Sequence, residues 1–89
     1  MQINFTKVVH FTRLIKAGGR LREFNFRKLK GPAEGIFDVN VCNERGDRFF
    51  FNMQKKDNDW KIGAGELPGW IVQNETNLNE AIEDELRRW

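Results

Sequence analysis

The middle of the chain carries the pattern of a β-hairpin. Residues 36–42 and 47–54 each alternate apolar with polar side chains around a Phe triplet, and residues 43–46 separate them. Alternation with a period of two is typical of a strand that buries one face. Gly46 readily adopts the positive φ that many hairpin turns require. The chain is therefore predicted to build an antiparallel sheet around this hairpin.

Two further strands extend the predicted sheet. Residues 20–28 read as a strand with Phe24 and Phe26 on one face, and a fourth strand begins at residues 60–62. One apolar face results, made by Phe24, Phe26, Phe37, Val39, Val41, Phe49, Phe51, Met53, Trp60 and Ile62. The opposite face is polar apart from Phe50. In an antiparallel meander, one face is usually buried and the other is exposed to solvent. Another element is therefore expected to pack on the apolar face.

The C-terminal segment is predicted to be that element. Its apolar residues recur at helical spacing and form one stripe, namely Leu78, Ala81, Ile82, Leu86 and Trp89. Asn77 followed by Glu80 resembles a capping box, which would start the helix at that point. Residues 67–72, in the connection before it, are expected to form an irregular turn or a short helix.

Residues 5–17 fit two structures. Val8, Phe11 and Ile15 follow helical spacing, and the glycines at 18 and 19 suit the end of a helix. The alternative is a strand that enters a hairpin turn at residues 16–20. The helix is preferred. The predicted fold is therefore a single α+β domain over residues 1–89, with an N-terminal helix, a four-stranded antiparallel β-meander and a C-terminal amphipathic helix covering one sheet face.

Charge is distributed unevenly along the chain. The formal net charge is +2, but residues 1–30 hold eight Lys and Arg against Glu23 alone. Residues 66–89 hold six acidic residues against Arg87 and Arg88. Such a distribution can attract an anionic partner to one end, hold the two ends of one chain together, or pair two chains head to tail.

Catalytic, cofactor and metal sites are not predicted. His10 is the only histidine and has no acidic neighbour in sequence, and Cys42 is the only cysteine. One His and one Cys cannot complete the common zinc ligand sets. The roles of these two residues stay open. A single cysteine, an N-terminus unlike a signal peptide and the lack of a ~20-residue apolar run favour a cytoplasmic protein without a membrane segment.

Basic and aromatic residues are interleaved in residues 20–28 and again in residues 45–51. Cations neutralise phosphates, and exposed rings stack on bases, so this pattern indicates single-stranded nucleic-acid binding as one possible function. The candidate contacts are Arg20, Arg22, Arg27, Lys28 and Arg48, with Phe50 as the stacking ring.

A family resemblance points the same way. Gly19-Arg20 before an aromatic strand, the Phe-Asp-Val strand at 37–39, the turn at 43–46 and a closing helix resemble PUR repeats. Those repeats are four-stranded sheets with a C-terminal helix that pair as dimers and bind single-stranded DNA or RNA. The loop at 31–35 departs from their pattern, because it separates the Gly-Arg turn from the Phe-Asp-Val strand. The resemblance spans about residues 19–86 and implies a nucleic-acid-binding sheet.

The function favoured by the sequence is a small non-enzymatic interaction module that self-associates. The expected partner is a second copy, as in a homodimer, or another protein. Sheet edges and the polar face leave surface for a partner, and a small core gains stability from association. The alternative is a single-stranded nucleic-acid-binding module.

Overall fold

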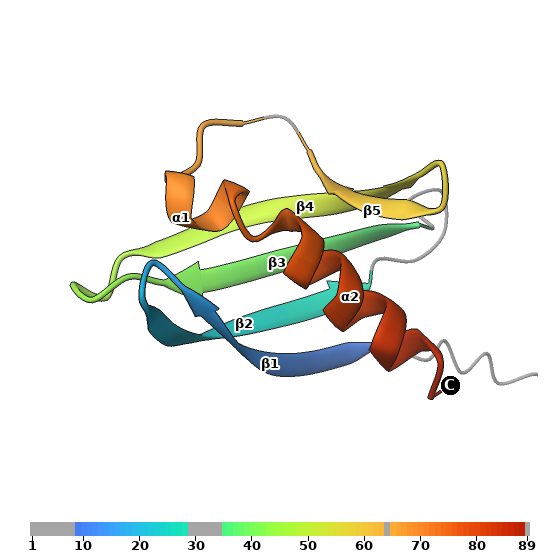
Figure 1. Cartoon of the computed structure of the whole chain (residues 1–89), viewed down its shortest axis with the longest axis horizontal. Coiled ribbons are helices and arrows are strands. Elements are labelled where there is room, and N and C mark those ends of the chain that lie inside the picture. The colour runs from blue at the N-terminus through green and yellow to red at the C-terminus, as the bar shows by residue number, and fades with distance from the viewer. Residues whose placement is uncertain (1–8, 29–34, 64, 89) are drawn as a thin grey trace, which may run out of the picture.

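An α+β fold with an antiparallel sheet and a C-terminal helix is present in residues 9–28, 35–63 and 65–88, the residues that the computed structural model describes (Figure 1). The elements are β1 (His10–Ala17), β2 (Arg20–Lys28), β3 (Ile36–Cys42), β4 (Arg48–Lys56), β5 (Asp59–Ile62), α1 (Gly69–Val72) and α2 (Glu75–Leu86). Within these residues, five strands lie side by side in chain order and form a meander. Strand β2 matches its predicted bounds, as does β3.

The predicted N-terminal helix is wrong, and the sheet has five strands where four were expected. Residues 10–17 form β1, which pairs with β2 from His10↔Arg27 to Ala17↔Arg20; residues 5–8 lie outside the described part of the chain. Gly18 and Gly19 have φ of 62° and 80°, which suits the tight two-residue turn of a hairpin. Pairing with β2 therefore decides the conformation of this segment.

The apolar sheet face is confirmed as the core. The completely or almost completely buried members of the predicted set are Phe24, Phe26, Phe37, Val39, Val41, Met53 and Trp60, while Phe49, Phe51 and Ile62 are partly buried. Phe11 of β1 stacks on Phe26 with ring centroids 4.6 Å apart. Trp60 meets Phe37 edge-on at 5.1 Å. Burying each large side chain contributes about 1.5–3 kcal/mol, so this face supplies most of the hydrophobic stabilisation.

Helix α2 covers this face, as predicted. Leu78 and Ile82 are fully buried beneath it, and Ile71 of the short helix α1 adds to the same core. The predicted cap is misplaced, because α2 begins at Glu75 and Asn77 lies inside it. The Asn77 side-chain amide donates instead to Asn74 Oδ1 at 2.8 Å. Trp89, the last residue of the predicted stripe, lies outside the described residues.

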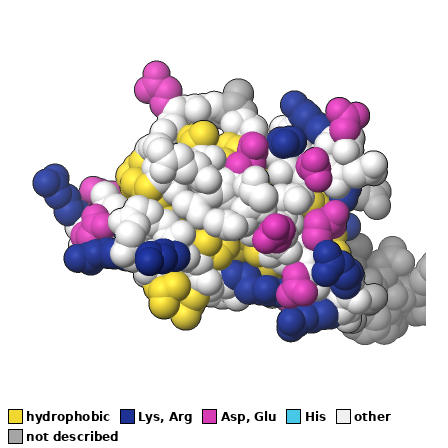
Figure 2. Space-filling model, viewed as in Figure 1, with side chains coloured by type: hydrophobic (Ala, Val, Ile, Leu, Met, Phe, Trp, Pro, Cys, Tyr) yellow, Lys and Arg dark blue, Asp and Glu magenta, His cyan; other side chains and the backbone are white. Residues whose placement is uncertain are grey.

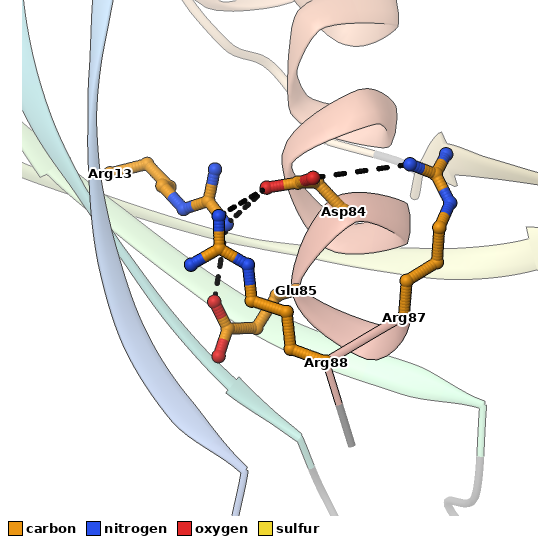
Figure 3. A network of polar contacts seen from close by, with 5 residues as sticks. All are labelled: Arg13, Asp84, Glu85, Arg87 and Arg88. Atoms are coloured by element: carbon orange, nitrogen blue, oxygen red, sulfur yellow. Dashed lines mark hydrogen bonds and ion pairs between the residues drawn. The ribbon is translucent and has the colours of Figure 1, made fainter.

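Polar contacts fix the direction in which α2 crosses the sheet (Figure 1). At its first turn, Glu75 accepts a hydrogen bond from the Ile62 amide of β5 at 2.9 Å. Near its end, Asp84 and Glu85 accept hydrogen bonds from the Arg13 guanidinium of β1 at 2.8 and 3.1 Å (Figure 3). The helix thus runs diagonally from one sheet edge to the other. One cation of the basic N-terminal third of the sequence, Arg13, therefore joins β1 to the acidic residues of α2.

Phe24 and Phe50 provide a matched test of this one-sided core. We expect Phe24→Ala to lower the free energy of unfolding by about 3–5 kcal/mol, because it opens a cavity among fully buried side chains. Phe50→Ala should change it by less than about 1 kcal/mol, because that ring is exposed. Urea unfolding of both variants measures the difference. Equal losses would show that the second sheet face is also covered.

The Arg13–Asp84 ion pair predicts a dependence of stability on pH. The hydrogen bond from Arg13 lowers the pKa of Asp84 below its ordinary value of 3.8. A carboxyl group whose pKa is lower in the folded state stabilises the fold above its unfolded pKa. That stabilisation is lost as the pH falls through the folded-state pKa. Asp84→Asn should therefore flatten the acid side of a stability–pH profile measured by thermal unfolding.

Asp59→Asn is the control for this pH measurement. Asp59 is exposed and forms no ion pair with any described residue. Its replacement should leave the acid side of the profile as steep as in the parent protein. If both variants flattened the profile alike, the Arg13–Asp84 contact would not be the cause.

Candidate binding surface on the open sheet face

The sheet face opposite α2 is called the open face here. It consists of His10, Thr12, Leu14 and Lys16 of β1, Leu21, Glu23, Asn25 and Arg27 of β2, Ile36, Asp38, Asn40 and Cys42 of β3, Arg48, Phe50, Asn52, Gln54 and Lys56 of β4, and Asp59 and Lys61 of β5. These positions alternate along each strand with the core residues, which assigns them to the other face. The register aligns them in rows that run across the strands.

A continuous chain of hydrogen bonds follows one row across β1, β2 and β3 and ends on Arg48 of β4, which lies one row away. The Thr12 hydroxyl donates to Asn25 Oδ1 at 2.7 Å, and Asn25 Nδ2 donates to Asn40 Oδ1 at 3.1 Å. The Arg48 guanidinium of β4 donates to the same Asn40 oxygen. Each side chain in the row is held by its neighbour. The polar groups are therefore positioned before any ligand arrives.

A hollow of about 570 Å³ lies on the open face. Its lining residues are His10, Asn25, Phe26, Arg27, Asp38, Val39, Asn40, Phe50, Phe51 and Asn52. Phe50 is 72% exposed, the most exposed of the large apolar side chains described. Arg27 and Asp38 stand opposite each other in the register of β2 and β3. The hollow thus combines one free ring, several amide groups and charges of both signs.

These groups can bind a ligand in two ways. Amide groups donate and accept hydrogen bonds, and a bare ring can stack on a planar ligand. His10 lies at the hollow, whereas Cys42 is half-buried on the same face opposite Arg48 in the register. Among the described residues, no group of three or more His, Cys, Asp or Glu is arranged to hold a metal ion.

The six candidate nucleic-acid contacts do not lie together. Arg27, Arg48 and Phe50 are on the open face. Arg20, Arg22 and Lys28 occupy the alternate positions of β2, on the side of Phe24 and Phe26. Strand alternation therefore divides the predicted cluster between the two faces. The hollow residues His10, Asn25, Asp38, Asn40 and Asn52 were not predicted as contacts, although the same alternation places them beside Phe50.

Arg22 has structural contacts on the covered side. Its Nε donates to the Ala17 carbonyl oxygen at 2.7 Å, and its guanidinium lies 4.2 Å from the centre of the Trp70 ring. It also forms an ion pair with Glu44, and the hydrogen bond in that pair lowers the pKa of Glu44. Arg22 thereby joins the β1–β2 hairpin to α1 and to the β3–β4 turn. Its guanidinium is occupied by these partners.

Comparisons with known proteins add no relative. No family model matches the chain, and searches of curated proteins and of solved structures gave no significant match. The resemblance to PUR repeats stays a prediction from the residues, and the described sheet has one strand more than the four of such a repeat. In the part of the chain that is described, no helix has the length and apolar character needed to cross a membrane.

The structural role of Arg22 can be tested by comparing its replacement with that of Arg20, a neighbour on the same strand. We expect Arg22→Met to lower the free energy of unfolding by about 1–3 kcal/mol, because it removes the hydrogen bond to the Ala17 carbonyl and the ion pair with Glu44. Arg20→Met should change it by less than about 0.5 kcal/mol, since Arg20 is exposed. Thermal or urea unfolding compares the two. Similar small effects would contradict the structural assignment of Arg22.

Proposed function

We propose that this protein is a small, cytoplasmic, non-enzymatic interaction module that associates with a second copy of itself. The observation that carries the proposal is the apolar exposure on the uncovered side of the sheet. Leu14, Leu21 and Phe50 are 65%, 69% and 72% exposed there, while the other face is tightly buried. The sheet thus presents large apolar side chains on a face that neither described helix covers.

The relative positions of the exposed leucines support this proposal more than their exposure alone does. Single exposed apolar residues are common on protein surfaces and need no partner. Leu14 and Leu21, however, are diagonal neighbours on β1 and β2, since Leu14 pairs with Glu23 and Lys16 pairs with Leu21. Two adjacent leucines form a patch whose burial contributes about 1.5–3 kcal/mol for each side chain. Association also stabilises a small fold by mass action.

Sedimentation equilibrium over a range of concentrations tests this function. We expect the apparent mass to rise from 10.5 kDa toward a multiple of that value as the protein concentration increases from micromolar to millimolar. The melting temperature should rise over the same range, because association stabilises only the folded chain. A constant mass of one chain at every concentration would overturn the proposal.

Single-stranded nucleic acid is the second candidate function. It is favoured by one specific arrangement, the free Phe50 ring beside a hollow that Arg27 lines, with Arg48 on the same face. Stacking on such a ring is worth about 1–3 kcal/mol per base, and the arginines can neutralise phosphates. Asp38 and Glu23 on the same face act against an anionic ligand.

Fluorescence anisotropy with labelled single-stranded oligonucleotides tests this second candidate. Binding at about 50 mM salt should weaken steeply as salt increases, and Phe50→Ala should lower the affinity by about 1–3 kcal/mol. Arg27→Ala should also weaken binding, whereas Arg20→Ala, on the other side of β2, should weaken it less. An absence of binding at low salt would remove the candidate.

A further inference from the structure

The two edges of the sheet differ in how their backbone amides are satisfied. At the β5 edge, the Trp60 amide donates to Asn79 Oδ1 at 2.7 Å, and the Ile62 amide donates to the Glu75 carboxylate at 2.9 Å. Both acceptors belong to α2. The helix thus covers the outward-facing donors of β5, which is also the shorter edge strand, with four residues.

The β1 edge has no such cover among the described residues. The Lys28 amide donates to the Val9 carbonyl oxygen at 2.8 Å, so odd-numbered residues of this segment direct their backbone groups toward β2. The even-numbered residues, which include Thr12, Leu14 and Lys16, therefore direct theirs outward. No described group bonds to them. An uncovered edge strand of eight residues without proline is a template for pairing with another strand.

We propose that β1 pairs antiparallel with β1 of a second copy, with Leu14 directly opposite the partner's Leu14. This inference rests on the self-association proposed above and names its surface. A two-fold axis perpendicular to the sheet passes between the two leucines and joins the sheets edge to edge. Thr12 then lies opposite the partner's Lys16, and the outward amides and carbonyls of these residues exchange hydrogen bonds.

The side chains of β1 select this register. Sliding the strands by two residues in one direction places Arg13 opposite the partner's Arg13, and like charges directly opposite each other are destabilising. Sliding them in the other direction shortens the paired segment to residues 13–17. In the chosen register, residues 11–17 pair, Arg13 lies opposite the partner's Ile15, and the 65% exposed Leu14 side chains meet at the axis.

Helix α2 also lies close to the proposed interface. The C-terminal end of α2 reaches the sheet edge near the start of β1 (Figure 1), so antiparallel pairing brings it toward the Lys16 end of the other copy. A hollow of about 520 Å³, lined by Ile15, Glu80 and Asp84 among others, lies along this edge. The Arg87 and Arg88 side chains at the helix end are 74% and 67% exposed.

Charges of both signs line this hollow, because Arg13 and Arg87 lie there with Glu80 and Asp84, and Arg87 and Arg88 pair with Asp84 of their own chain at 3.9 and 3.2 Å (Figure 3). Figure 2 shows acidic side chains over α2 with basic side chains beside them toward its C-terminal end. An isologous pairing brings this mixed-charge edge of one copy beside the same edge of the other. The same pairing joins the two open faces into one continuous surface.

A matched pair of arginine substitutions tests the surface. Leu14→Arg places two like charges at the axis, so we expect the dissociation constant of the dimer to rise by about tenfold or more. Val72→Arg makes the same kind of change at an exposed apolar position on α1, away from the β1 edge, and should have a much smaller effect. Sedimentation equilibrium measures both, and circular dichroism with thermal unfolding verifies that each variant is folded.

Disulfide formation tests the register. In a Cys42→Ser background, Leu14→Cys should oxidise to a covalent dimer, because Cα atoms in a hydrogen-bonded pair lie about 5.5 Å apart, within disulfide range. Thr12→Cys and Lys16→Cys place the two thiols roughly 13 Å apart in this register and should not cross-link efficiently. Non-reducing electrophoresis after mild oxidation compares the three variants.

The outcomes separate the two proposals. A parent protein that stays monomeric at every concentration overturns both the self-association and this interface. A parent dimer that Leu14→Arg leaves intact, or that cross-links better through residue 12 or 16 than through residue 14, overturns the interface or its register and leaves self-association standing. Selective loss with Leu14→Arg and selective cross-linking at residue 14 support the inference.

Discussion

The diagonal packing of α2 across the apolar sheet face is the constraint on which the rest of the structure depends. A single helix has to cover the core side of five described strands, and it does so by crossing them from β5 to β1. Leu78 and Ile82 supply the apolar contact, whereas Glu75 at one end and Asp84 at the other fix the crossing direction. Since the described chain has only this helix and the short α1 for cover, the second sheet face is left without one.

The same helix treats the two sheet edges differently. At β5 its side chains accept hydrogen bonds from backbone amides, which removes the donors that another strand would need. At β1 it contacts a side chain, the Arg13 guanidinium, and leaves the outward backbone groups unbonded by any described residue. The crossing of α2 thus covers the outward amides of β5 and leaves the outward backbone groups of β1 accessible among the described residues. This asymmetry limits edge-to-edge association to a single strand, which favours a closed pair over an open chain of copies.

Much of the fold follows from local pattern, and the failure at β1 shows where pattern becomes insufficient. Strands β2 and β3 were predicted with their observed bounds because their alternation is bracketed by turn residues. In β1, Phe11 and Ile15 are four residues apart, a spacing that places two side chains together on a helix and also on one face of a strand. Gly18-Gly19 likewise suits a helix end and a hairpin turn. Only the long-range pairing with β2 distinguishes the two structures, and a local pattern does not contain it.

The candidate site could be predicted only in part, again because a local pattern does not contain contacts between distant elements. Alternation within β2 already separates Arg27 from Arg20, Arg22 and Lys28, so a stricter use of the same pattern would have divided the basic cluster. The partners of Arg22 were not accessible in this way. The Ala17 carbonyl is close in sequence, but Trp70 and Glu44 come from other elements that only the assembled fold brings together. Residues that bridge elements carry no local signature of that role.

Electrostatics connects the two candidate functions. Arg13 is engaged by α2 and Arg22 by Glu44, so fewer cations are free than the charge of residues 1–30 suggests. On the open face of one copy, the cations Lys16, Arg27, Arg48, Lys56 and Lys61 are partly offset by the acids Glu23, Asp38 and Asp59. A single copy therefore offers a weak field to a polyanion. Edge-to-edge pairing would align two such faces side by side, so that one extended strand could contact arginines of both copies. Nucleic-acid binding of useful affinity would then depend on self-association, because the polyanion gains contacts only when both faces are present.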